Sequence, residues 1–168
     1  MKNLVLILTI LLGISADLIS QVSNPKFKKK IDRVLSESVD FITVDELKSN
    51  TDSYYILDAR EKEEYTTSHI PGAHYIGYDD LDLSALEGIP KDKPIVVYCS
   101  IGYRSEKVGE KLLDRGFMNV QNLYGSIFEW SNRGFPVYNS EGQATTKVHT
   151  YNKRWSKWVD NPQVEKVW

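Results

Sequence analysis

The fold of this chain is decided by the stretch Ile95-Val96-Val97-Tyr98-Cys99-Ser100-Ile101-Gly102-Tyr103-Arg104-Ser105. Its first four residues form a continuous apolar run that begins directly after Pro94, which is typical of a strand buried on both faces of a sheet. The residues from Cys99 onward predict a short loop that opens a helix, because Gly102 allows the backbone to curl. A buried strand, a tight loop and a helix in this order indicate a parallel α/β sheet.

Strand and helix signals alternate along the chain on both sides of this stretch. Thr43 and Glu46 have the spacing of a capping box, which predicts a short helix through Lys48. The apolar run Tyr54-Tyr55-Ile56-Leu57 predicts a strand that ends at Asp58. Further short elements are expected over residues 61–65, 75–76, 81–86 and 120–124. The pattern predicts a central parallel sheet with helices on both faces.

Two helices are predicted after the apolar run at 95–98. In the first, Val108 and Leu112 share one face, polar residues from Glu106 to Asp114 cover the other, and Gly116 ends the helix. The second opens at Ser126-Ile127-Phe128-Glu129, where the spacing predicts a capping box with Ser126 as the N-cap.

Cys99 is the only cysteine of the chain. It follows a buried strand, as Asp58 does, and parallel sheets bind their ligands beyond the carboxyl ends of the strands. The backbone N–H groups of the following helix and the Arg104 guanidinium both favour a thiolate at this point. The pattern predicts a nucleophile for anionic substrates. The alternative is a small buried residue that completes the core, as free cysteines often do.

Several motifs, in the same order, resemble the rhodanese-like sulfurtransferases. The motifs are Leu57-Asp58-Ala59-Arg60-Glu61 with Glu64-Tyr65, Ser68-His69-Ile70-Pro71-Gly72-Ala73, Cys99 to Ser105, and Gly125 to Trp130. Together they cover about residues 43–138. The resemblance implies the family's α/β fold, in which a central parallel sheet carries helices on both faces.

The resemblance also implies a role for each matching residue. Cys99 would be the nucleophile that takes a sulfane sulfur as a persulfide and passes it on, and the loop of Ser100, Ile101, Gly102, Tyr103, Arg104 and Ser105 would bind that sulfur. Asp58 and Arg60 would form a buried pair that braces the strand end. The implied partners are a small sulfur donor, either thiosulfate or a persulfide, and a thiol or cyanide-like acceptor. No cofactor is implied.

Two positions depart from the family's pattern. Gly125-Ser126 stands where the family often has two glycines, and Ser126 as an N-cap would preserve the helix start. Ser100, Ile101 and Tyr103 are uncharged, whereas family members that are efficient with thiosulfate often carry extra cations there. The loop therefore leaves the donor open.

Two other functions compete with sulfur transfer. Cysteine-dependent phosphatases and arsenate reductases use a thiolate in a similar loop that ends in arginine, but their loop is one residue longer. Here four residues separate Cys99 from Arg104, and Tyr98 rather than histidine precedes the thiol. The shorter loop suits a sulfur atom better than a phosphate. The third interpretation is a binding module that keeps the fold without catalysis.

Composition limits the class of protein. A chain of 168 residues, 41% of them hydrophobic, is long enough for one domain with a core. A net charge of −2 argues against nucleic-acid binding. His69 is expected to be a turn residue rather than a base, and the scattered histidines predict no metal site. A single cysteine allows no intramolecular disulfide.

The two ends of the chain differ from the middle. Residues 1–20 have a Lys2 start, an apolar run and small residues, which predicts a signal peptide and export to the periplasm or medium. A membrane anchor is the alternative, but the apolar run is shorter than a membrane-spanning helix requires. Residues 21–40 are expected to be a basic arm, a solvated or mobile segment, and the family domain is expected over 41–140. The extension at 141–168 concentrates aromatic residues, and Trp155 and Trp158 predict a short amphipathic helix packed on the domain. A protein-binding surface or a lid near the Cys99 loop are the alternatives.

Overall fold

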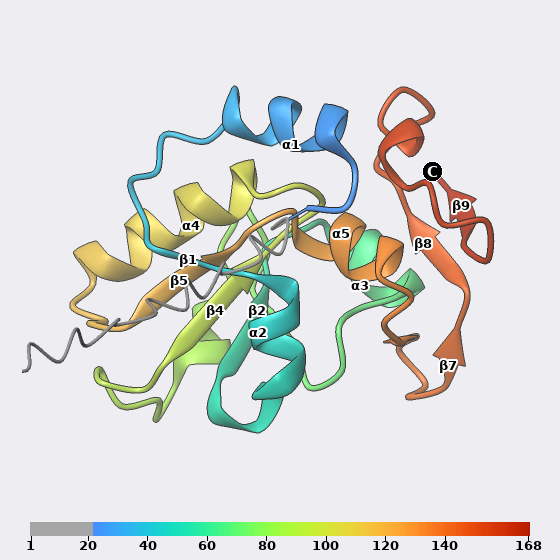
Figure 1. Ribbon diagram of the computed structural model, residues 1–168. Helices are drawn as coiled ribbons and strands as arrows, with labels where there is room; N and C mark the ends of the chain where they lie inside the picture. The colour runs from blue at the N-terminus through green and yellow to red at the C-terminus, as the bar shows by residue number, and fades with distance from the viewer. Residues whose placement is uncertain (1–21) are drawn as a thin grey trace, which may run out of the picture.

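The computed structural model describes residues 22–168 and shows a parallel sheet between two layers of helices (Figure 1). The five strands have the order β1-β5-β4-β2-β3, and every pair in this sheet is parallel. They are β1 Phe41–Ile42, β2 Tyr55–Asp58, β3 His74–Tyr75, β4 Ile95–Tyr98 and β5 Val120–Leu123. The predicted α/β class is therefore confirmed.

The helices begin close to the residues that the sequence indicated. They are α2 Val44–Ser49, α3 Lys62–Thr67, α4 Tyr103–Asp114 and α5 Ser126–Asn132, with 3₁₀ turns at Thr51–Ser53 and Leu83–Leu86. The capping box of α2 is confirmed, because the Thr43 and Glu46 side chains each bond the other's backbone N–H. Gly116 follows α4 with a positive φ of 84°, as predicted for the residue that ends the helix.

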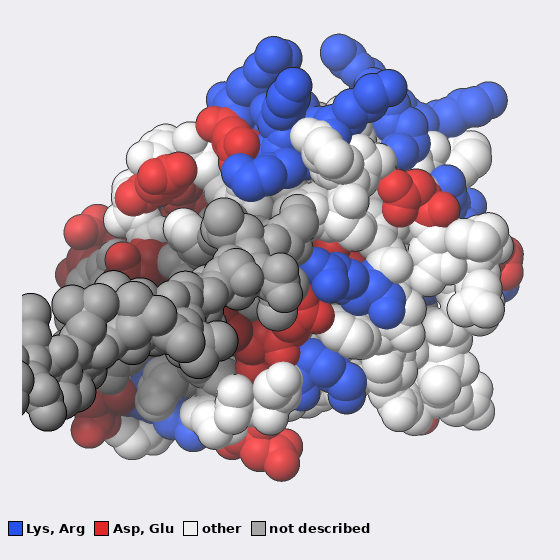
Figure 2. Space-filling view, viewed as in Figure 1, with Lys and Arg blue, Asp and Glu red and all other residues white. Residues whose placement is uncertain are grey.

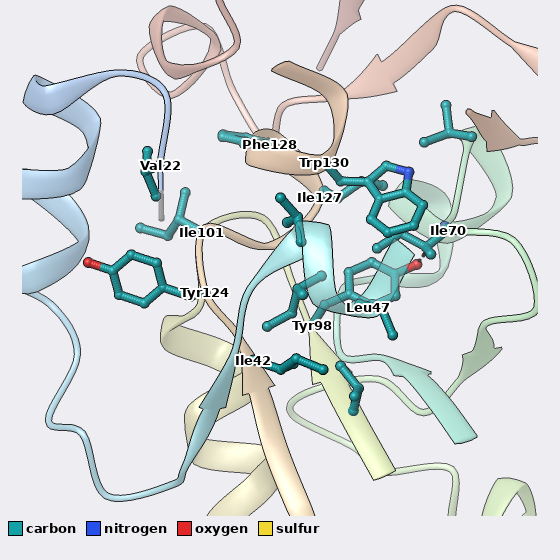
Figure 3. Close-up of a cluster of buried hydrophobic side chains, with 14 of the residues drawn as sticks. Val22, Ile42, Leu47, Ile70, Tyr98, Ile101, Tyr124, Ile127, Phe128 and Trp130 are labelled. Carbon is teal, nitrogen blue, oxygen red and sulfur yellow. Dashed lines mark hydrogen bonds between the residues drawn. The ribbon is translucent and has the colours of Figure 1, made fainter. Parts of the chain in front are cut away.

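Two hydrophobic clusters fill the space on the two faces of the sheet. Alternate residues of β4 divide between them, since Ile95 and Val97 join one cluster and Val96 and Tyr98 the other. Figure 3 shows the second cluster, with Ile101 at one end and Trp130 at the other. Burial on both faces explains why β4 is apolar throughout, and it holds the strand end rigidly.

Two predictions of polar positions were wrong. Ser126 does not cap α5: Gly125 is the N-cap, and Ser126 itself has a positive φ of 53°. Its buried hydroxyl instead contacts the strand ends. Glu106 does not face solvent with the other polar residues of α4. It is 1% exposed and accepts hydrogen bonds from the N–H groups of Ser36 and Ser38, which ties the segment before β1 to α4.

The basic segment near the N-terminus is a packed helix and not a mobile arm. Helix α1 (Pro25–Asp32) is capped by Asn24, and its Phe27 and Ile31 side chains are fully buried in the core. Its lysines lie on the other side, where Figure 2 shows Lys and Arg gathered along the edge of the molecule above α1. The expected solvated lysine face is therefore present, but it belongs to a helix that the apolar side chains of Phe27 and Ile31 hold on the domain.

The C-terminal extension forms small strand pairs rather than an amphipathic helix. Strand β7 (Ala144–Thr145) pairs antiparallel with β6 (Val137–Tyr138), which precedes the extension, and β8 (Lys147–His149) pairs parallel with β9 (Glu165–Val167). Between β8 and β9, the helical residues are those of one 3₁₀ turn, Ser156–Trp158. Trp155 and Trp158 nevertheless pack against the core, and the Trp158 ring stacks on Phe27 at 5.6 Å.

The predicted signal peptide lies outside the described residues. Within residues 22–168, none of the helices has the length and apolar character that crossing a membrane requires.

Candidate active site

Cys99 occupies the carboxyl end of β4, and its backbone is fixed by the start of α5. Its N–H donates to the Ser126 hydroxyl at 3.1 Å, and its carbonyl accepts from the Ile127 N–H at 3.2 Å. The residue is only 1% exposed. The site of the predicted nucleophile is therefore rigid and largely dry.

The loop after Cys99 presents a hydrogen-bond donor to its sulfur. The N–H of Gly102 donates to Sγ at 3.2 Å, and Ser105 lies close enough to the sulfur to interact with it. Helix α4 begins at Tyr103, so its N-terminal end, with its partial positive charge, lies beside the thiol. The loop and helix start together form an anion site around one sulfur atom.

These groups decide the protonation state of Cys99. Burial raises the pKa of the thiol, but the charge of Arg104 and the hydrogen bonds from Ser105 and Gly102 outweigh burial, so the pKa lies below that of a free cysteine. A lower pKa increases the fraction of Cys99 that is present as the thiolate, which is the nucleophilic form of a cysteine.

Arg104 is held by Glu64, a residue that the sequence reasoning did not single out as part of the site. Its Nη1 and Nη2 atoms donate to the two carboxylate oxygens of Glu64 at 2.7 and 2.9 Å, and Nη2 also donates to the Ser100 hydroxyl at 2.9 Å. Burial raises the pKa of Glu64, but bonds to Arg104 outweigh it and lower that pKa. Arg104 is therefore fixed near the thiol, and its Nη1 and Nη2 atoms are already hydrogen-bonded to Glu64 and Ser100.

Asn122 orients the loop from β5 and was also missed. Its side-chain amide donates to the Gly102 carbonyl at 3.0 Å, and its Oδ1 accepts from the Ser105 hydroxyl at 2.7 Å. This turns the Gly102 carbonyl away from the sulfur and leaves the N–H facing it. A buried polar residue in the strand Val120–Leu123 was the signal that could have revealed it.

Gly102 is required by the backbone conformation of the loop. Its φ of 120° is one that residues with a side chain rarely adopt, and an added Cβ would lie 3.3 Å from the Leu35 side chain.

We expect Gly102→Ala to lower the free energy of unfolding by about 1–3 kcal/mol and to raise the pKa of Cys99, because the Gly102 N–H would move away from the sulfur. Chemical denaturation and the pH dependence of alkylation would measure the two effects. Gly88→Ala is the control, since its φ is also positive but it lies in open space, away from the site. An unchanged alkylation profile in Gly102→Ala would contradict the proposed role of this N–H.

Asp58 and Arg60 form a buried ion pair beside the site. Arg60 Nε and Nη2 donate to the two Asp58 oxygens at 2.9 and 2.6 Å, and the Tyr98 hydroxyl donates to the same carboxylate at 2.6 Å. Both charged side chains are fully buried and neither lines the cleft above Cys99. The hydrogen bond from Tyr98 in β4 to Asp58 in β2 therefore holds the two strand ends together. It also explains why a tyrosine, rather than another apolar residue, precedes Cys99.

The other predicted loop residues serve different purposes. Ile101 is 6% exposed and packs into the core, so it anchors the loop. Tyr103 is 45% exposed at the cleft rim.

His69 lies in a turn, where its Nδ1 atom contacts the Tyr65 carbonyl at 3.1 Å and its ring stacks on the Tyr65 ring. In residues 22–168, no three His, Cys, Asp or Glu side chains lie together as a metal site would require.

Cys99 lies at the base of a cleft of about 630 Å³. The loop supplies one side of the cleft with Ser100, Ile101, Tyr103 and Arg104. The rest of the lining comes from elsewhere in the chain, namely Lys30, Arg33, Val34, Glu61, Tyr78, Asp79, Tyr151 and Trp155. Segments at both ends of the described chain therefore close around the thiol.

Comparison with known proteins gives one family. The model of the rhodanese-like domain family matches residues 43–133. The chain is 32% identical over 94 residues to a sulfurtransferase of Allochromatium vinosum, covering 56% of this chain and 87% of that protein. It is 33% identical over 75 residues to the thiosulfate sulfurtransferase GlpE of Coxiella burnetii, covering 45% and 69%. It spans only 20% to 55% of the length of other curated relatives.

A solved structure gives the same result. The rhodanese-like domain of the Anabaena protein Alr3790 superposes with a TM-score of 0.53 at 28% identity, covering 57% of this chain and 76% of that one. The fold neighbours are thus of the same class as the sequence relatives.

Proposed function

This chain belongs to the rhodanese-like domain family, and we propose that it is a sulfurtransferase that carries the transferred sulfur as a persulfide on Cys99. Relatives named as sulfurtransferases support the activity at the level of the family. The observation that carries the mechanism is the Cys99 sulfur, whose pKa is lowered and which receives the Gly102 N–H at 3.2 Å at the base of a cleft.

The first step loads the sulfur. The Cys99 thiolate attacks the outer sulfur of a donor, either thiosulfate or an organic persulfide, and a Cys99 sulfur–sulfur bond forms as the donor's own sulfur–sulfur bond breaks. The electron pair of the broken bond leaves with sulfite or with the organic thiolate. No proton has to move once the thiolate is present, which is consistent with a site that has no general base beside the sulfur among its described residues.

The second step passes the sulfur on. A nucleophile such as a thiolate attacks the outer sulfur of the Cys99 persulfide, and the Cys99 thiolate leaves with the electron pair of the broken bond. Loop N–H groups stabilise the negative charge on sulfur in both steps. The two displacements have one intermediate, a protein heavier by one sulfur atom.

That intermediate gives the test. We expect wild-type protein incubated with thiosulfate or an organic persulfide to gain the mass of one sulfur atom, and to lose it on addition of a thiol. Cys99→Ser should gain nothing, because the hydroxyl is not ionised at neutral pH. Intact mass spectrometry measures both, and circular dichroism controls for folding of the variant.

The competing functions predict different results. Hydrolysis of an aryl phosphate by wild type, lost in Cys99→Ser, together with no gain of sulfur would replace sulfur transfer by phosphatase chemistry. A binding module would gain no sulfur and hydrolyse nothing. Equal sulfur gain in wild type and Cys99→Ser would contradict the assignment of the nucleophile.

A further inference from the structure

The cleft above Cys99 is much larger than the inorganic substrates of sulfur transfer. Its volume of about 630 Å³ corresponds to roughly 20 water molecules. Cavities of this size bind organic molecules of several tens of atoms. Five of its lining residues lie outside the residues 43–133 that match the family, namely Lys30, Arg33, Val34, Tyr151 and Trp155. The extra space is therefore bounded in part by segments outside the family match.

Two aromatic side chains of the C-terminal segment form an apolar wall. The Tyr151 ring lies over the Arg104 guanidinium, with 5.4 Å from Cζ to the ring centre, and the Trp155 ring lies 5.2 Å from Lys30 Nζ. Tyr151 has a φ of 65°, which is uncommon for a residue with a large side chain and concentrates at functional sites. The ring is 53% exposed, so its surface is available to a ligand.

Charges of both signs surround this wall. Lys30 and Arg33 come from α1 and the residue after it, whereas Glu61 and Asp79 come from the N-cap of α3 and the loop after β3. Arg104 already forms a bidentate ion pair with Glu64. The cations at the rim are therefore the groups that can receive a carboxylate of a ligand, and the rim carboxylates can receive an ammonium group.

We propose that the cleft binds an organic thiol, or its persulfide, built like an amino acid or short peptide. The sulfur reaches Cys99, the organic part packs against Tyr151 and Trp155, and the carboxylate lies at Lys30 and Arg33. The assignment of this molecule as a substrate rests on the proposed function. Tyr151 and Trp155 are then residues that determine specificity for the sulfur transfer.

Binding can be measured without sulfur transfer. S-methylglutathione is an unreactive peptide thioether, and we expect it to slow alkylation of Cys99 by iodoacetamide in wild-type protein. Its dimethyl ester, which lacks free carboxylates, should protect roughly tenfold less well. Trp155→Ala should weaken protection by the parent compound about tenfold, since an aromatic wall is lost.

The control variants match these changes in chemistry. Lys30→Gln with Arg33→Gln should lose protection, while Lys26→Gln with Lys29→Gln removes the same charge from exposed positions outside the cleft and should keep it. Trp168→Ala removes an exposed tryptophan that does not line the cleft and should also keep it. Equal protection in all variants, or equal protection by the ester, would overturn the proposal.

Sulfur transfer gives an independent readout. In discharge of the persulfide, Trp155→Ala should raise the KM for glutathione more than the KM for 2-mercaptoethanol, which is too small to contact the aromatic wall. Protection without any gain of sulfur on Cys99 would reject the proposed function and keep the ligand class. Sulfur gain without protection would keep the function and reject the ligand class.

Discussion

Replacing Arg104 with glutamine is expected to slow alkylation of Cys99 at neutral pH roughly tenfold. The charge of Arg104 is one of the groups that lower the pKa of the thiol against the opposing effect of burial. Without it the pKa rises, so the midpoint of the rate-against-pH curve moves to higher pH and less thiolate is present at neutrality. Iodoacetamide rates from acidic to alkaline pH, followed by intact mass, measure the shift.

Arg104→Gln also leaves the Glu64 carboxylate buried without its cation, so the stability of the variant has to be measured alongside its alkylation rate. In the double variant R104Q/E64Q the pair is neutral, and we expect stability to recover while alkylation stays slow. Arg115→Gln removes a guanidinium from the exposed end of the same helix and should change neither property. A wild-type pH profile in Arg104→Gln would show that the loop N–H groups alone stabilise the thiolate.

Replacing Arg60 with methionine is expected to lower the free energy of unfolding by about 3–5 kcal/mol. Arg60 and Asp58 are both fully buried, so removing the guanidinium leaves a carboxylate that neither water nor another cation reaches. The Tyr98 hydroxyl alone remains to bond its Oδ2 atom. Chemical denaturation followed by circular dichroism measures the loss.

The double variant D58N/R60M tests the cause. The amide oxygen at position 58 can still accept from Tyr98, and no charge is buried, so the double variant should be more stable than Arg60→Met alone. Equal loss in both variants would show that packing of the long Arg60 side chain, rather than its charge, accounts for the effect.

The sheet was predictable from the sequence because two of its neighbouring strands, β2 and β4, are compact apolar runs. Ile95 to Tyr98 is apolar throughout, and both Asp58 and Cys99 follow such runs directly. Helix starts were predictable where a side chain caps the backbone, as at Thr43. At Ser126 the same spacing misled, because the hydroxyl bonds the Cys99 N–H instead and the helix begins one residue earlier.

The site was predictable in its nucleophile and loop but not in its supports. Cys99 and Arg104 stand out by residue type and spacing. Glu64 and Asn122 act through contacts between residues at least 17 positions apart, which no local pattern encodes. Trp155 likewise lies in a segment between β8 and β9, two paired strands too short to be recognised in the sequence.

The division of the cleft between two parts of the chain has an evolutionary consequence. The thiol, its loop and its bracing ion pair lie within residues 43–133, whereas the aromatic wall and the rim cations lie before and after them. Mutations in the flanking segments can therefore change which molecules reach the sulfur without disturbing the chemistry. The same segments also place Phe27 and Ile31 in the core, so substitution of their cleft-facing side chains, rather than exchange of whole segments, is the route to new substrates on an unchanged loop.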